Sequence, residues 1–337
     1  MDKKYFIDPS YEVFYKNRLF ESFDETLNRD DQLYPFRRMK DYLSKKNDFI
    51  YTADLLMDAD KDIKGQYVSL GILSNLKRFS KFKGLKRNSF VIMEPPVVAN
   101  YLYKKLPYIT KYFDKVYLHN TVGDGYDLTN IDKKKLKKFY WPIPYNKVID
   151  QVWNNKDRSD NIVMINGNHK PSFFIKELYS KRINVLIELS NNANIDLYGK
   201  GWDQWWSRKS WWFPYIKNYF SLRSIYKGSC HSKFEVLKNY KFCICFENME
   251  MKGYISEKIF DCFYSGAIPI YLGATDVKEY IPEDTFIDYR NFENSSDLLS
   301  YLKNMKQSKV LEIKNNAKAF LSSSKINKFY DSLINLL

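Results

Sequence analysis

The sequence predicts an α/β fold made of two Rossmann-like domains. From residue 47 onward, short apolar runs alternate with amphipathic segments. This alternation is typical of parallel sheets that helices cover on both faces. The length of 337 residues allows roughly two domains of ordinary size. With 45% hydrophobic and 28% charged residues, the chain can form a packed core, which excludes an intrinsically disordered protein.

Seven short apolar segments are predicted strands, because several are rich in β-branched residues and most end in Gly, Pro, Asn or Asp. They are Asp48–Thr52, Ser89–Met93, Lys115–His119, Asn161–Ile165, Ile195–Tyr198, Phe242–Phe246 and Ala267–Leu272. The clearest helix is predicted over Phe173–Leu189, where apolar side chains recur at helical spacing. The first 45 residues are polar, aromatic and irregular.

A domain boundary is predicted near residue 155. Two prolines in Trp141–Pro144 and the polar run Asn154–Asp160 interrupt the pattern there. We expect an N-terminal Rossmann-like domain over 1–155, a C-terminal one over 156–310 and a Lys-rich helical tail over 311–337. Facing domains would direct the carboxyl ends of their strands toward a central cleft, where α/β sheets bind ligands.

Charge and cysteine content restrict the partners and the compartment. The 54 Lys and Arg exceed the 40 Asp and Glu, so the net charge of +14 favours an anionic partner such as a nucleotide, a nucleic acid or an anionic membrane. Four cysteines are too few for a disulfide framework, and three histidines without a Cys-x-x-Cys pair argue against structural zinc. The N-terminus lacks the apolar core of a signal peptide, and no run approaches ~20 apolar residues. We therefore expect a cytoplasmic protein.

The most informative segment, Asn239–Gly273, predicts a strand, a polar loop, a helix and a second strand. Lys241–Phe246 is apolar, and Glu247–Gly253 is a polar loop. Ser256 is a candidate N-cap, and Gly266 is placed to end the helix. The loop and the helix N-terminus would then lie at the carboxyl edge of the sheet, where free backbone N–H groups suit a phosphate.

Two charged residues occupy the first turn of this predicted helix. Glu257 is favourable there and can accept hydrogen bonds from ribose hydroxyls. Lys258 is unfavourable by a few tenths of a kcal/mol, up to about 1 kcal/mol, so we expect an anion such as a diphosphate to offset its charge. A solvated lysine on a surface turn is the alternative, and spacing alone favours neither.

The motifs of this segment resemble the signature of the family-10 α-1,3/4-fucosyltransferases, in particular bacterial members. They are Tyr240-Lys241-Phe242, Phe246-Glu247-Asn248, Tyr254-Ile255-Ser256-Glu257-Lys258 and Gly266-Ala267-Ile268-Pro269-Ile270, at the family's spacing. A weaker resemblance extends over 85–310. It includes Val91–Pro96, where Pro95 replaces the serine of the family's Glu-Ser-Pro-like tripeptide.

The resemblance implies a GT-B fold whose C-terminal domain binds the donor nucleotide. It implies an inverting transfer of L-fucose from GDP-fucose to a hydroxyl of an N-acetylglucosamine-containing glycan, in α-1,3 or α-1,4 linkage. No metal or other cofactor is expected, because Lys and Arg neutralise the diphosphate. The expected context is synthesis of surface polysaccharide or lipopolysaccharide, with an oligosaccharide or lipid-linked acceptor, peripheral contact with the inner face of the membrane, and no nucleic acid.

The resemblance also implies roles for individual residues. Glu94 is the expected base that takes the acceptor proton. Lys258 and Arg182 are expected to bind the diphosphate. The other predicted donor-binding residues are Glu247, Asn248, Tyr254, Ser256 and Glu257. Without the resemblance, a turn carboxylate in water is the favoured interpretation of Glu94. An exposed helix charge is the alternative for Arg182, and a loop-capping amide is an equal alternative for Asn248. A second phosphate-binding arginine has no clear position; Arg208 and Arg223 are candidates.

Three further patterns have competing interpretations. Asp58-Ala59-Asp60 with Asp62 imitates a metal-binding Asp-x-Asp, but a solvated turn is favoured. Trp202–Trp212 holds five of the seven tryptophans and indicates an acceptor-facing or membrane-facing surface, or a loop packed on its own domain. The basic runs Lys77–Arg87 and Lys133–Lys138 are solvated faces or contacts with anionic lipid.

Two rival functions follow from the same residues. The first is a glycosyltransferase with the same fold and site that uses a different nucleotide-sugar donor. A non-enzymatic nucleic-acid-binding protein would fit the charge and the aromatic content, but would leave the signature unexplained.

Overall fold

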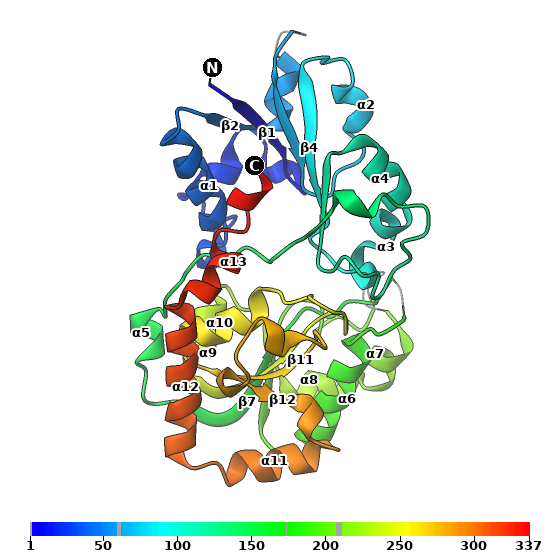
Figure 1. Cartoon of the computed structure of the whole chain (residues 1–337). Helices are drawn as coiled ribbons and strands as arrows, with labels where there is room; N and C mark the ends of the chain where they lie inside the picture. Colours follow the sequence, from blue (N-terminus) through cyan, green and yellow to red (C-terminus); the bar gives the residue numbers. More distant parts are fainter. Residues whose placement is uncertain (1, 59–61, 173, 207–210) are drawn as a thin grey trace. The chain divides into compact units, whose positions relative to one another are not determined.

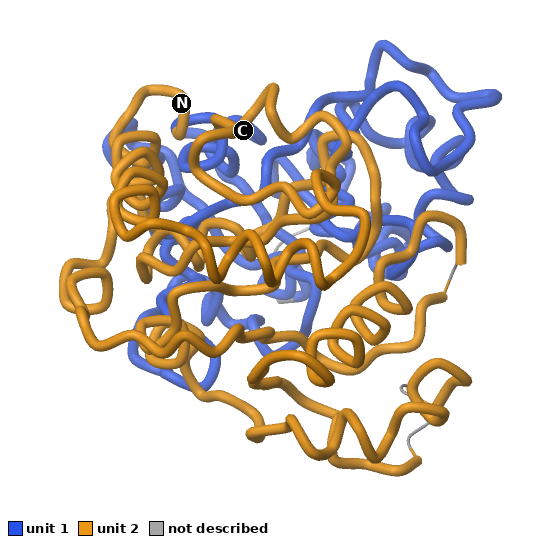
Figure 2. The backbone as a smooth tube through the Cα atoms, turned by 90° about the horizontal axis from the view of Figure 1, so that it is seen from below, with its two compact units in different colours: residues 1–144, 327–337 blue, residues 145–326 orange. Residues whose placement is uncertain are grey.

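The chain folds into two compact units, each with its own sheet. The computed structural model describes residues 2–58, 62–172, 174–206 and 211–337. The units comprise residues 1–144 with 327–337, and residues 145–326 (Figures 1 and 2). Each contains a six-stranded sheet whose neighbouring strands are all parallel. The predicted α/β class with two Rossmann-like units is confirmed.

The division between the units differs from the predicted one. It follows Pro144 rather than residue 155. The predicted helical tail begins as α12 (Gln307–Leu321) of the C-terminal unit, but residues 327–337 belong to the N-terminal unit. There the side chains of Asn88 and Ser89 donate hydrogen bonds of 3.2 and 2.8 Å to the Leu336 carbonyl. The end of the chain is therefore part of the N-terminal core, not a separate helix.

The N-terminal unit has the strand order β2-β1-β3-β4-β5-β6. Its strands are β1 (Lys4–Asp8), β2 (Phe49–Thr52), β3 (Gly65–Ser69), β4 (Leu85–Val91), β5 (Lys115–Leu118) and β6 (Leu136–Lys138). Its helices are α1 (Tyr34–Ser44), α2 (Leu76–Phe79), α3 (Pro96–Lys104), α4 (Leu106–Tyr112) and α13 (Asn327–Tyr330). The expectation of irregular structure before residue 45 is wrong, because β1 is an inner strand with Phe6 and Ile7 buried on opposite faces.

The C-terminal unit has the strand order β12-β11-β10-β7-β8-β9. Its strands are β7 (Ser159–Ile165), β8 (Ile195–Tyr198), β9 (Tyr226–Gly228), β10 (Tyr240–Phe246), β11 (Ile268–Leu272) and β12 (Ile287–Asp288). Its helices are α5 (Asp150–Trp153), α6 (Tyr179–Ser190), α7 (Phe213–Lys217), α8 (Tyr219–Ile225), α9 (Lys233–Leu237), α10 (Glu257–Ser265), α11 (Ser295–Lys303) and α12. All four predicted strands of this unit are present, whereas the helix predicted from residue 173 begins only at Tyr179.

The order of the C-terminal strands reverses between β7 and β10. From β7 the chain passes through α6 to β8 on one side, and from β10 it passes through α10 to β11 on the other. Because such crossovers are right-handed, α6 and α10 cover opposite faces of the sheet (Figure 1). Adjacent β7 and β10 thus form a topological switch point, and ligands bind outside the carboxyl ends of strands at such points.

One half-buried arginine joins the C-terminal ends of three helices of this unit. The Arg158 guanidinium donates to the carbonyls of Trp153 in α5 (3.2 Å), Leu237 in α9 (3.3 Å) and Ser265 in α10 (2.5 Å). Burial lowers its pKa to about 10, so it stays charged at neutral pH. A cation is favourable there because helix C-termini carry partial negative charge.

We expect Arg158→Lys to lower the free energy of unfolding by about 2–4 kcal/mol, because one ammonium group cannot reach all these carbonyls. Urea unfolding followed by circular dichroism measures the change. Arg18→Lys is the control, since Arg18 is 41% exposed and pairs with Asp24 at the surface. Equal changes in the two variants would show that Arg158 does not join these helices.

None of the helices in the described ranges has both the length and the apolarity needed to cross a bilayer.

Candidate functional site

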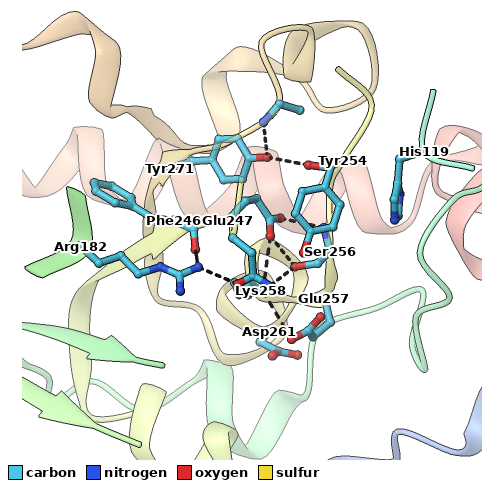
Figure 3. A network of polar contacts seen from close by, with 12 residues as sticks. His119, Arg182, Phe246, Glu247, Tyr254, Ser256, Glu257, Lys258, Asp261 and Tyr271 are labelled. Carbon is cyan, nitrogen blue, oxygen red and sulfur yellow. Dashed lines mark hydrogen bonds and ion pairs between the residues drawn. The ribbon is translucent and has the colours of Figure 1, made fainter. Parts of the chain in front are cut away.

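A buried carboxylate marks the carboxyl end of β10. Glu247 follows this strand, is fully buried, and donates its backbone N–H to the Leu272 carbonyl at 2.8 Å. Its Oε1 accepts the Ser256 backbone N–H, and its Oε2 accepts the Ser256 hydroxyl, both at 2.7 Å (Figure 3). The Lys258 ammonium lies 3.4 Å from Oε2. Glu247 therefore fixes the start of α10 against the end of β10.

The close packing around Glu247 requires glycine at position 273. A Cβ atom there would lie 2.5 Å from Glu247 Cγ and 2.6 Å from the Tyr271 hydroxyl oxygen. The same hydroxyl accepts the Ala274 N–H at 3.0 Å and lies 3.5 Å from the Tyr254 carbonyl. The loops after β10 and β11 are thus held together over the helix start.

Ser256 occupies the predicted N-cap position, but its hydroxyl does not cap α10. It donates to Glu247 instead and accepts from the Lys258 ammonium at 2.9 Å. The predicted capping bond is therefore wrong, because the hydroxyl oxygen accepts the Lys258 ammonium instead of a backbone N–H of α10. The first N–H groups of α10 receive no acceptor from the N-cap side chain, which leaves the helix start suited to an anion.

Lys258 is held by carboxylates rather than by solvent. Its side chain is 17% exposed. Burial alone would lower its pKa, but the charges of Glu257 and Glu247 outweigh burial and raise it. The solvated-lysine alternative is wrong. The anionic group expected to offset this cation is supplied in part by the protein itself, since Glu247 and Glu257 lie 3.4 and 4.0 Å from the ammonium.

An ion-pair network that the sequence analysis missed extends along α10. Lys233, the first residue of α9, lies 3.2 Å from the carboxylate of Glu257 and 2.7 Å from that of Asp261. Glu257 and Asp261 are four residues apart and so share a helix face, which was the available signal. Burial would raise the pKa of Glu257, but Lys258 and Lys233 hold it at about 2.

This lowered pKa makes the contribution of Glu257 to stability dependent on pH. A carboxyl group whose pKa falls from 4.5 to about 2 on folding stabilises fully above pH 4.5 and loses that effect as the pH falls toward 2. Between those limits, wild-type protein should lose about 3 kcal/mol more stability than Glu257→Gln. Urea midpoints at a series of pH values measure this difference. Parallel curves for both proteins would contradict it.

Arg182 lies on the other side of the switch point, on α6. It is 2% exposed, and one terminal nitrogen donates to the Phe246 carbonyl (2.7 Å) and to Asn248 Oδ1 (2.9 Å). The exposed-charge alternative is wrong. The Leu178 N–H also donates to the Asn248 carbonyl at 3.1 Å, so α6 and the loop after β10 are tied together. Contact of Arg182 with a phosphate stays a prediction.

Tyr254 lies in the same loop, with its residue 1% exposed. Its predicted contact with a nucleotide would therefore require movement of the loop. Asn248 is half-buried, as its bond to Arg182 requires.

Glu94 belongs to the N-terminal unit and follows β4. It is half-buried, and its carbonyl accepts the Tyr103 hydroxyl at 2.9 Å. His119, which the sequence analysis did not select, follows the neighbouring β5 and donates from Nε2 to the Met93 carbonyl at 2.6 Å. Burial lowers the pKa of His119 to about 3, so its ring is neutral at pH 7. Both residues lie at the carboxyl edge of the N-terminal sheet.

No group of three or more His, Cys, Asp or Glu residues suited to a metal ion occurs within the part of the chain that the structure describes. Two residues of the Asp-x-Asp candidate, Ala59 and Asp60, lie outside the described residues, as does Arg208. Asp62 is exposed.

Comparison with known proteins identifies the C-terminal unit. Residues 175–313 match the model of the C-terminal part of glycosyltransferase family 10, the fucosyltransferases. This stretch of the chain is therefore similar to the C-terminal part of the family 10 fucosyltransferases. The match includes Arg182, the switch point and all of α10, so the resemblance noted in the sequence is confirmed for the unit that holds this site.

Curated relatives match the chain over short segments. An α-(1,3)-fucosyltransferase of Helicobacter pylori is 36% identical over 83 residues, 25% of this chain and 17% of that protein. The mouse 4-galactosyl-N-acetylglucosaminide 3-α-L-fucosyltransferase 9 is 38% identical over 84 residues, 24% of this chain and 21% of that protein. These matches therefore cover only about a fifth of each relative's length.

The solved structure of a glycosyltransferase from Rickettsia africae resembles the whole chain. The match covers 99% of this chain and 95% of the Rickettsia africae chain, with 11% sequence identity and a TM-score of 0.56. At this identity the likeness concerns the fold alone. The two parallel six-stranded sheets are those of the GT-B fold.

Proposed function

We propose that this chain transfers L-fucose from GDP-fucose to a hydroxyl of an N-acetylglucosamine-containing glycan, with inversion and in α-1,3 or α-1,4 linkage. The observation that carries the proposal is the match to the family 10 model, which includes the segment from β10 to α10. In this segment Lys258 lies in the first turn of α10, at a topological switch point of the sheet.

The donor diphosphate would bind at the start of α10. Backbone N–H groups there and the Lys258 ammonium offer positive charge, and the pKa of Lys258 keeps it protonated. Glu257 would accept hydrogen bonds from the ribose hydroxyls, and Glu247 and Ser256 would position Lys258. Arg182 and Asn248 would shape the loop, with Arg182 and Tyr254 in reach of the donor once the loop moves. No metal or other cofactor takes part in this proposal.

Glu94 would act as the base. Its carboxylate takes the proton from the acceptor hydroxyl while that oxygen forms a bond to the anomeric carbon of fucose. The bond from this carbon to GDP breaks on the opposite face, which inverts the configuration. GDP leaves with the electron pair, and Lys258 stabilises the developing negative charge.

The reaction would serve surface polysaccharide or lipopolysaccharide synthesis, with an oligosaccharide or lipid-linked acceptor. The chain would work in the cytoplasm, with peripheral contact with the inner face of the membrane.

Incubation with GDP-fucose and a panel of N-acetylglucosamine-containing acceptors, followed by mass spectrometry, tests the proposal. A product heavier by one deoxyhexose residue is expected. A parallel thermal-shift panel with GDP, UDP and CMP tests the donor. Selective stabilisation by UDP or CMP would assign a different donor to the same site. If no nucleotide stabilises the protein and it binds RNA in a salt-sensitive manner, the proposed enzyme function is wrong. The protein would then be a nucleic-acid-binding protein.

A further inference from the structure

The tryptophan-rich segment of the C-terminal unit divides into buried and exposed rings. Trp202 and Trp212 are 2% and 6% exposed, and the Trp202 Nε1 donates to the Asn166 carbonyl, just after β7, at 2.6 Å. The Tyr215 hydroxyl donates to the Gln204 carbonyl at 2.6 Å. These contacts anchor the segment, so the interpretation as a loop packed on its own domain holds for only part of it.

Five other large aromatic side chains of this segment are between 48% and 80% exposed. They are Trp205, Trp206, Trp211, Phe213 and Phe220, which we call the aromatic group. The Trp205 ring lies 6.4 Å from that of Phe220 and 5.1 Å from that of Tyr219, so the loop and α8 share one apolar surface. Exposed aromatic side chains that gather in this way are typical of a binding face.

The charges around the aromatic group indicate the occupant. Residues 199–228 contain six Lys and Arg and one acidic residue, Asp203. Lys200, Lys217 and Arg223 are exposed, and none of the three forms an ion pair with another described residue. Trp and Phe beside unpaired cations suit the interface of an anionic bilayer. A sugar platform instead needs carboxylates or amides beside one or two rings, and this segment has little of either.

We propose that the aromatic group and its flanking cations form a membrane-binding face for anionic phospholipid. The rings would lie at the level of the headgroups, and Lys200, Lys217 and Arg223 would contact lipid phosphates. This inference deepens the membrane contact included in the proposed function by assigning it to a surface. It does not depend on GDP-fucose, so its test is independent of activity.

Co-sedimentation of the full chain with vesicles tests the proposal. One set contains equal parts of phosphatidylcholine and phosphatidylglycerol, and the other contains phosphatidylcholine alone. We expect binding to the first set, weakened by salt, and at least about tenfold weaker binding to the second. Trp205→Ser with Phe220→Ser, and separately Lys217→Glu with Arg223→Glu, should each reduce binding at least about tenfold.

Two matched controls locate the face. Phe23→Ser removes a 77% exposed phenylalanine of the N-terminal unit. Lys133→Glu with Lys134→Glu reverses two exposed charges in the basic run Lys133–Lys138 of the same unit. Both should bind vesicles like wild type, and circular dichroism should show all variants folded. Failure of wild type to bind either vesicle would overturn the proposal, as would full binding by the Trp205/Phe220 variant. Loss of binding only in the Lys133/Lys134 variant would also overturn it.

Discussion

Lys258→Ala is expected to lower kcat by about 10²–10³-fold and to weaken GDP binding at least about tenfold, because it removes the cation proposed to stabilise the departing diphosphate. The substitution also leaves the buried Glu247 without its nearest cation. We therefore expect a loss of stability of about 1–3 kcal/mol. Initial rates with GDP-fucose, calorimetric titration with GDP and thermal unfolding measure the three effects.

The control for this variant is Lys309→Ala. Lys309 is 44% exposed on α12 and pairs with Glu312, so its removal should change none of the three quantities appreciably. Lys258→Arg separates charge from shape and should retain part of the GDP affinity. Unchanged GDP affinity in a folded Lys258→Ala protein would remove the phosphate-binding role of this residue.

Glu94→Gln is expected to lower kcat by about 10²–10⁴-fold while GDP affinity stays at the wild-type value. The amide keeps the size of the side chain but cannot take the acceptor proton. Steady-state kinetics and GDP titration together give the result, with Glu25→Gln as the control at an exposed glutamate of the same unit.

A near-normal kcat in Glu94→Gln would place the base elsewhere. His119 would be the next residue to test, since it follows β5, the strand adjacent to β4.

The sequence predicted much of the fold because the inner strands are strongly apolar. Phe242–Phe246 and Ile195–Tyr198 lie within one or two residues of their strands in the structure. β9 and β12 are only three and two residues long, too short for a periodic signal. The return of residues 327–337 to the N-terminal unit rests on long-range bonds to the Leu336 carbonyl, which no local pattern reveals.

The positions of the site residues along the backbone were predictable from the motif. The hydrogen-bond and ion-pair partners of their side chains were not. The place of Ser256 and Lys258 at the start of α10 follows from the strand, the loop and Gly266, whose φ of +72° ends the helix. The partners of Ser256 do not follow, because Glu247 is nine residues away in sequence and reaches it only through the fold. Lys233 was missed for the same reason, since it comes from α9.

A crystal structure of the GDP complex tests the central claim most directly. The account predicts the diphosphate at the start of α10, within hydrogen-bonding distance of the Lys258 ammonium and of the first backbone N–H groups of that helix. A diphosphate bound anywhere else on the chain, with Lys258 still held by Glu247, Glu257 and Ser256, would contradict it.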